Sequence, residues 1–176
     1  VHPSYQGTKM LVEDCIAASG AKTVYIMLGM NDIGLYGIDD TITNYKTLVD
    51  KVMSKSPTST IYLMGLTPTN NAGTTSRAKA LNDYLASLAT ENSKIRYVDT
   101  YTPLLNGSVA NTKYFYPDNY LGGIGYVAVA NKMKEALVKD FPDDTYNVIS
   151  EAEAEKRHVQ AGLRNILTQM IAKGQL

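Results

Sequence analysis

Residues 23–32 read TVYIMLGMND, and this stretch decides how the rest of the chain is interpreted. Its first six residues are apolar, aromatic or β-branched without interruption, which is typical of a strand buried on both faces of a parallel sheet. The run stops at Gly29, where a backbone without a Cβ can turn sharply. Asn31 and Asp32 follow directly, so the stretch predicts a buried strand with polar side chains just beyond its carboxyl end.

Two further apolar runs, at 60–64 (TIYLM) and 95–98 (IRYV), predict strands of the same kind. Apolar residues at helical spacing predict helices over 7–19, 40–54, 75–91 and 124–141, the first ended by Gly20. Strands that alternate with helices predict a three-layer α/β fold, with a doubly wound parallel sheet of the flavodoxin-like kind. Ligands bind such sheets beyond the carboxyl ends of the strands, so the loops at 29–32, 65–74 and 99–123 are the candidate site.

The composition excludes several classes of function. The chain has 176 residues, with 17 Lys and Arg balanced by 17 Asp and Glu, so no basic surplus is available to bind nucleic acid. No apolar run approaches the ~18 residues that span a membrane. One cysteine (Cys15) and two histidines (His2 and His158) argue against a disulfide framework and against a metal centre. We therefore expect no metal centre built on cysteines or on several histidines.

The pattern divides the chain into an α/β domain at 1–141 and a tail at 142–176. In the tail, Ser150 and Glu153 form a capping box, and an apolar stripe follows at helical spacing. The tail is therefore predicted to be a linker followed by an amphipathic helix. The helix could dock on the domain or pair with another chain, and the sequence leaves both open.

Asn31 is the most informative polar residue in the candidate site. Its side-chain NH2 at a strand end could donate a hydrogen bond to a developing oxyanion, as acyl-transfer sites require. The alternative is structural: Asn31 would close an Asx turn, and Asp32 would cap the next helix. Asp99, also at a strand end, could likewise contact a ligand or simply close its loop.

Two segments together resemble the SGNH hydrolase family of GDSL-type esterases and lipases. Residues 25–33 (YIMLGMNDI) are similar to the family block with a strand and Gly-x-Asn-Asp, and residues 117–126 (PDNYLGGIGY) are similar to the last block. The resemblance covers about residues 8–139. It implies that Asn31 donates to the oxyanion hole and that Asp118 orients a catalytic His. Gly29 and Gly7 are the further oxyanion-hole candidates.

The sequence also departs from the family at the catalytic groups. No Gly-Asp-Ser, the block that supplies the nucleophile on the first strand, occurs in the chain. The third residue after Asp118 is Leu121, where the family has His, and the interval to Gly125-Tyr126 is one residue short. The resemblance therefore implies that the first strand is missing, and that a second chain or another segment completes the sheet.

Two functions remain open. The first is a serine esterase or acylhydrolase that cleaves a small acyl or acetyl ester, or an acylated saccharide. It requires no metal or organic cofactor, and it is competent only if a missing segment supplies Ser and His. The alternative is a non-catalytic SGNH-like domain for binding or assembly. The sequence does not settle the compartment.

Overall fold

The computed structural model describes residues 3–117 and 120–157, and all structural statements below concern these residues. At its centre lies a three-stranded parallel sheet in the order β3-β4-β5. The strands are β3 (Thr23–Ile26), β4 (Thr60–Met64) and β5 (Ile95–Val98). The sequence predicted β4 and β5 with these bounds, whereas β3 ends two residues before the end of the predicted run at 23–28.

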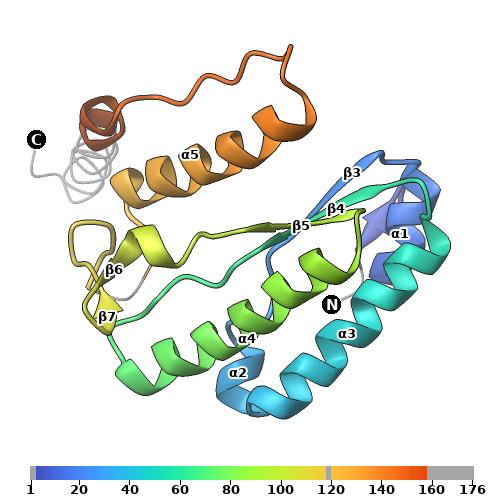
Figure 1. Cartoon of the computed structure of the whole chain (residues 1–176), viewed down its shortest axis with the longest axis horizontal. Helices are drawn as coiled ribbons and strands as arrows, with labels where there is room; N and C mark the ends of the chain where they lie inside the picture. The colour runs from blue at the N-terminus through green and yellow to red at the C-terminus, as the bar shows by residue number, and fades with distance from the viewer. Residues whose placement is uncertain (1–2, 118–119, 158–176) are drawn as a thin grey trace, which may run out of the picture.

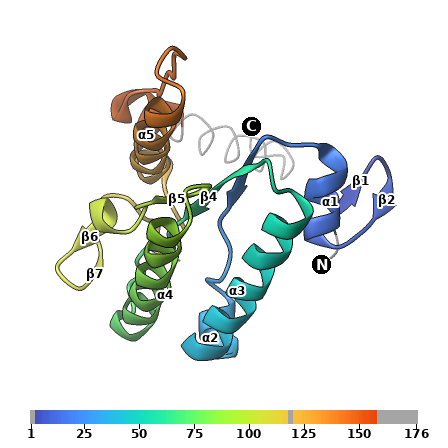
Figure 2. The same ribbon diagram turned by 45° about the vertical axis from the view of Figure 1, so that its right-hand side comes forward.

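Helices cover both faces of the sheet, which confirms the predicted α/β class (Figures 1 and 2). The helices α3 (Ile38–Lys55) and α4 (Ala72–Glu91) pack on one face. The helix α5 (Gly123–Asp140) packs on the opposite face. The short helix α2 (Asp32–Leu35), which the sequence did not predict, connects the end of β3 to α3.

Strand β4 shows why the apolar runs are continuous. Successive side chains of a strand point to opposite faces of the sheet. Ile61 and Leu63 join the cluster with α3 and α4, and Tyr62 and Met64 join the cluster with α5. Because both faces are covered by helices, both sets of side chains are mainly apolar.

An ion pair holds the end of α5 against the sheet. Asp140 accepts hydrogen bonds from Nε and Nη2 of Arg96, each at 2.9–3.0 Å, and one from the hydroxyl of Tyr62. Burial works to raise the pKa of Asp140, but the hydrogen bonds from Arg96 and Tyr62 outweigh burial and lower it below the ordinary value. The folded state therefore stabilises the ionised carboxylate.

The N-terminal helix begins later than predicted. The helix α1 spans Val12–Ser19, and Gly20 ends it in the left-handed conformation with φ +63°, as its position after the apolar stripe predicted. Before it, β1 (Ser4–Tyr5) and β2 (Thr8–Lys9) pair as an antiparallel hairpin. Gln6 and Gly7, both with positive φ, form its two-residue turn, which is typical of a tight hairpin.

The long segment 99–123 contains small elements in place of a structureless loop. It forms a 3₁₀ turn, η1 (Thr102–Leu104), and a hairpin of β6 (Leu105–Asn106) and β7 (Val109–Ala110). Asp99 begins the segment, and its Oδ1 accepts hydrogen bonds from the backbone N–H groups of Tyr101 and Thr102 at 3.0 and 2.9 Å. The loop-closing role of Asp99 is thus confirmed.

One long edge of the sheet, along β3, has no neighbouring strand among the described residues. A groove of about 520 Å³ runs along it, lined by the apolar side of α1 and by residues 24–28. Tyr25, Met27 and Leu28 are 42–49% exposed there, although they belong to an apolar strand sequence. The expected first strand would lie at this edge.

The tail begins as the sequence predicted. Ser150 Oγ accepts a hydrogen bond from the N–H of Glu153, and residues 151–157 are helical. The remainder of the predicted amphipathic helix, with His158, lies outside the described residues. No helix in the described part of the chain is long and apolar enough to cross a membrane.

Candidate functional site

A cavity of about 520 Å³ opens at the carboxyl ends of β3 and β4, where the sequence placed the candidate site. Residues 27–32, after β3, form one wall, and Leu66, Thr67 and Thr69, after β4, form another. Tyr120 and Leu121, just before α5, and Tyr126, in its first turn, close the third side. Three segments far apart in the sequence therefore meet at one edge of the sheet, as a parallel sheet requires.

Asn31 lines this cavity with an unengaged side chain. It is the N-cap residue of α2, yet its side chain makes no capping hydrogen bond. Its backbone is helical (φ −73°, ψ −36°), and its carbonyl accepts the N–H groups of Gly34 and Leu35. The Asx-turn alternative is therefore wrong, and Asp32 is the first residue of α2 and not its cap. The exposed NH2 of Asn31 is available to a ligand.

Gly29 makes the sharp turn between β3 and Asn31. Its φ is +110°, a backbone conformation that residues with a Cβ rarely adopt. A Cβ built there would also lie 2.9 Å from Cδ2 of Leu81, a residue with no exposed surface. The turn can therefore approach α4 closely only because residue 29 is glycine.

The wall after β4 is fixed by a buried amide. Asn82 of α4 accepts a hydrogen bond from the N–H of Leu66 at 2.7 Å and donates one to the Leu66 carbonyl at 2.9 Å. Both backbone groups are buried, so without Asn82 they would be left unpaired at a cost of about 1–3 kcal/mol each. Asn82 thus determines where Leu66 and the following residues lie.

Thr75 holds the next part of the same wall. Its hydroxyl accepts from the N–H of Thr69 and donates to the Thr69 carbonyl, both at 2.9 Å. Thr69 also accepts at its carbonyl the N–H of Ala110, so the β6–β7 hairpin is tied to this wall. The wall is consequently rigid, with hydrogen bonds from two other elements.

The sequence did not single out Asn82 or Thr75, although a signal was present. Both lie on the buried face of α4, together with Ala78, Leu81 and Leu85. A polar residue within an apolar helical stripe has to find a hydrogen-bond partner. Which backbone groups it would meet depends on the packing of α4 against the end of β4, and helical spacing alone does not contain that information.

The other site residues from the sequence are placed as follows. Asp118 lies outside the described residues, but Tyr120 and Leu121, two and three positions later, line the cavity with Asn31. Gly7 lies in the exposed turn of the β1–β2 hairpin and is not among the residues that line this cavity. Asn31 and Gly29 are thus brought together, and Gly7 is not.

The lining residues determine what the cavity can do chemically. Its described lining includes the amide of Asn31, the carboxylate of Asp32, two threonines and two tyrosines, but no His, Ser or Cys. No group of His, Cys, Asp and Glu in the described part of the chain could hold a metal ion. The cavity can therefore bind a polar acceptor atom, but its described residues lack a nucleophile with its base.

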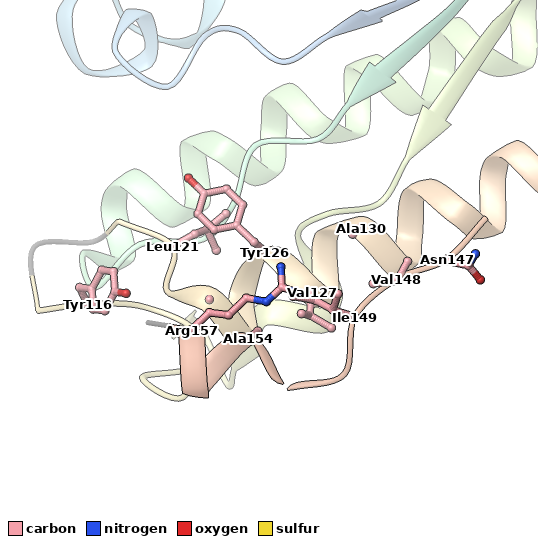
Figure 3. Close-up of a pocket in the computed structure, with 11 residues that line it drawn as sticks. Tyr116, Leu121, Tyr126, Val127, Ala130, Asn147, Val148, Ile149, Ala154 and Arg157 are labelled. Carbon is pink, nitrogen blue, oxygen red and sulfur yellow. The ribbon is translucent and has the colours of Figure 1, made fainter. Parts of the chain in front are cut away.

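A second, apolar cavity of about 650 Å³ adjoins the first, because Leu121 and Tyr126 line both (Figure 3). It lies between α5 and residues 147–157. Figure 3 shows the side chain of Arg157 extending across it toward Val127 and Ile149. The Arg157 Nε donates to Glu153 at 3.0 Å, so one charged pair lies at the edge of a mainly apolar hollow.

Comparison with known proteins connects this geometry to a family. The model of the GDSL-like lipase/acylhydrolase family matches residues 4–128. No curated protein matches the sequence. Three solved structures have the same fold, each with a TM-score of 0.60.

The first of these structures is a Streptococcus pneumonia protein described as a platelet activating factor, 19% identical over 66% of this chain and 60% of that one. The second is a carbohydrate esterase family 3 protein from Talaromyces cellulolyticus, 16% identical over 75% of this chain and 66% of that one. The third is an acetyl esterase variant with acetate ion, 16% identical over 74% and 65%. The chain thus spans 60–66% of their lengths, and identities this low show the fold alone.

Proposed function

Because the chain belongs to the GDSL-like lipase/acylhydrolase family, we propose that the cavity around Asn31 is the ester site of a serine esterase. The observation that carries the proposal is the Asn31 side chain, which lines the cavity and makes no hydrogen bond to any described residue. A neutral amide donor at this place can stabilise the oxyanion that forms when an ester carbonyl is attacked.

In the proposed mechanism, a serine hydroxyl attacks the ester carbonyl while a histidine takes its proton, and Asp118 orients that histidine. The Asn31 NH2 and a backbone N–H at the Gly29 turn hold the carbonyl oxygen as it becomes negative. Gly7 is given no part, because the structure does not bring it to the cavity. The substrate would be a small acyl or acetyl ester, or an acylated saccharide.

We propose further that the serine and the histidine come from outside the described residues, with a strand added along the free edge of β3. A parallel strand added there would end beside the carboxyl end of β3, which leads into Asn31. Its following loop would then reach the cavity, where ligands of such sheets bind. The exposed apolar groove along β3 supports this, since unpaired strand edges accept a further strand.

The test is hydrolysis of p-nitrophenyl acetate by a preparation whose mass and N-terminus have been measured. Activity is expected only when the preparation contains more than the 19.2 kDa of residues 1–176, and a serine-directed phosphonate should abolish it. In an active preparation, Asn31→Ala should lower kcat about 10²–10³-fold. The matched control is Asn131→Ala, which removes an exposed amide on α5 and should leave kcat unchanged.

Two results would count against the proposal. The first is an active preparation in which Asn31→Ala is no slower than Asn131→Ala. The second is a well-folded 19.2 kDa monomer that melts cooperatively, because its sheet would then be stable without an added strand. The second result would favour the non-catalytic binding domain, which the absence of His, Ser and Cys from the described cavity lining also favours.

A further inference from the structure

A second polar cleft, of about 610 Å³, lies on the other side of the wall that Asn82 and Thr75 support. It is bounded by α4, the end of β5 and the β6–β7 hairpin. Asn82 and Thr75 form part of its floor and are buried, as is Tyr101. Their polar groups have hydrogen-bond partners. The Tyr101 hydroxyl donates to the Thr75 carbonyl at 3.1 Å, and the side chains of Asn82 and Thr75 bind the backbone of the wall. The floor is therefore preformed.

Two polar groups in this cleft are left available. The hydroxyl of half-buried Tyr97 makes no hydrogen bond to any residue that the structure describes. Burial, and then the nearby carboxylates of Asp99 and Asp83, raise its pKa, so the hydroxyl stays protonated and can donate. Asp99 uses Oδ1 to close its loop, which leaves Oδ2 as an acceptor. The cleft thus contains one donor, the Tyr97 hydroxyl, and one acceptor, Asp99 Oδ2, that have no hydrogen-bond partner among the described residues.

The charges in the cleft indicate which ligands fit. Lys79 and Asp83 neutralise each other in an ion pair at 2.7 Å. Asp99 then leaves one net negative charge, which disfavours phosphates and carboxylates. The lining also carries two tyrosine rings and several hydroxyls, among them Ser76 at the rim. A ring molecule with a C–H face and a hydroxyl edge satisfies both kinds of surface.

We propose that this cleft is a binding site for neutral saccharide units, with Tyr97 and Asp99 as the groups that bind sugar hydroxyls. The inference goes beyond the proposed esterase function, since the cleft needs neither a serine nor a histidine. It lies behind the wall of the ester cavity, because Thr69 lines the ester cavity and Thr75, hydrogen-bonded to Thr69, lines the cleft. A bound chain could therefore be held beside the ester site.

The test is saturation-transfer NMR of the full chain with xylotriose and with cellotriose at about 10 mM, suited to millimolar binding. Saturation transfer from the protein to at least one trisaccharide is expected. Tyr97→Phe should weaken binding about five-fold, the effect of one lost neutral hydrogen bond. Asp99→Asn keeps the Oδ1 acceptor that closes the loop and replaces only the free oxygen, so it should also weaken binding. Inorganic phosphate should not compete.

Three matched variants make the result interpretable. Tyr84→Phe removes a buried hydroxyl outside the cleft and should bind as the parent does. Ser76→Trp fills the cleft from an exposed position, so it should abolish binding without disturbing the core. Asn31→Ala should bind normally, because it alters only the ester cavity. Thermal melting confirms that each variant is folded.

The proposal is overturned if neither trisaccharide receives saturation, or if Ser76→Trp binds as well as the parent. It is overturned equally if Asn31→Ala abolishes binding, because the sugar would then occupy the ester cavity. Loss of esterase activity in Asn31→Ala with sugar binding retained would support both proposals. Sugar binding by a preparation without esterase activity would support this one alone.

Discussion

Replacing Gly29 by alanine tests the geometry that presents Asn31 to the cavity. Two separate costs are expected. The φ of +110° is unfavourable for alanine by about 1–2 kcal/mol. In addition, the new Cβ would lie 2.9 Å from Cδ2 of fully buried Leu81, and such overpacking costs about 1–3 kcal/mol. Gly29→Ala should therefore lower the free energy of unfolding by about 2–5 kcal/mol.

The two costs can be separated with matched variants. Gly20 has a φ of +63°, but a Cβ at this position would meet no atom within 4 Å, so Gly20→Ala should show the backbone cost alone, about 1–2 kcal/mol. Leu81→Val removes the Cδ2 atom, so Gly29→Ala made in that background should cost only about as much as Gly20→Ala. The cycle isolates the contact between residues 29 and 81.

The assay is urea unfolding followed by far-UV circular dichroism, with the midpoint and slope compared for the parent and all four variants. If Gly29→Ala costs no more than Gly20→Ala, the predicted contact with Leu81 does not exist. An unchanged cost of Gly29→Ala in the Leu81→Val background would also contradict the contact, because the turn would then not press against α4. An unchanged slope is required for the comparison to hold.

Three further variants test other parts of the structure. Asp140→Asn should lower stability by about 1–2 kcal/mol near neutral pH, since Arg96 is partly exposed. Folding lowers the pKa of Asp140, so this stabilisation is fully present above the unfolded pKa of about 3.9 and is lost as the pH falls through the lower folded pKa. The melting temperatures of the parent and of Asp140→Asn should therefore converge in acid. Asn82→Ala should lower the free energy of unfolding in urea by about 2–5 kcal/mol, because both backbone groups of Leu66 lose their partner. A loss under about 1 kcal/mol would contradict the role of Asn82 in holding Leu66. Tyr84→Phe should leave the melting temperature unchanged or raise it, because the buried hydroxyl has no partner among the described residues, and a clear drop would show that one exists.

Much of the architecture follows from local sequence. The run at 60–64 is apolar at every position but Thr60, and it forms a strand with these bounds because both of its faces are covered. Gly20 ends α1 where the apolar stripe stops, since glycine adopts the left-handed conformation without a Cβ penalty. By contrast, the stripe predicted over 7–19 included residues that form a hairpin, because Gly7 readily adopts the positive φ that a two-residue hairpin turn requires.

The alternation of strands and helices and the place of Asn31 beyond a strand end can be predicted from the amino-acid sequence, because burial periodicity and glycine positions are local properties of a chain. The folded structure was needed to show that the Asn31 amide makes no hydrogen bond and that Asn82 and Thr75 hold the wall opposite it. It alone brought Tyr97 and Asp99 to one cleft. Such pairings depend on how α4 packs against the ends of β4 and β5, and contacts between segments distant in the chain leave no periodic signal in either segment.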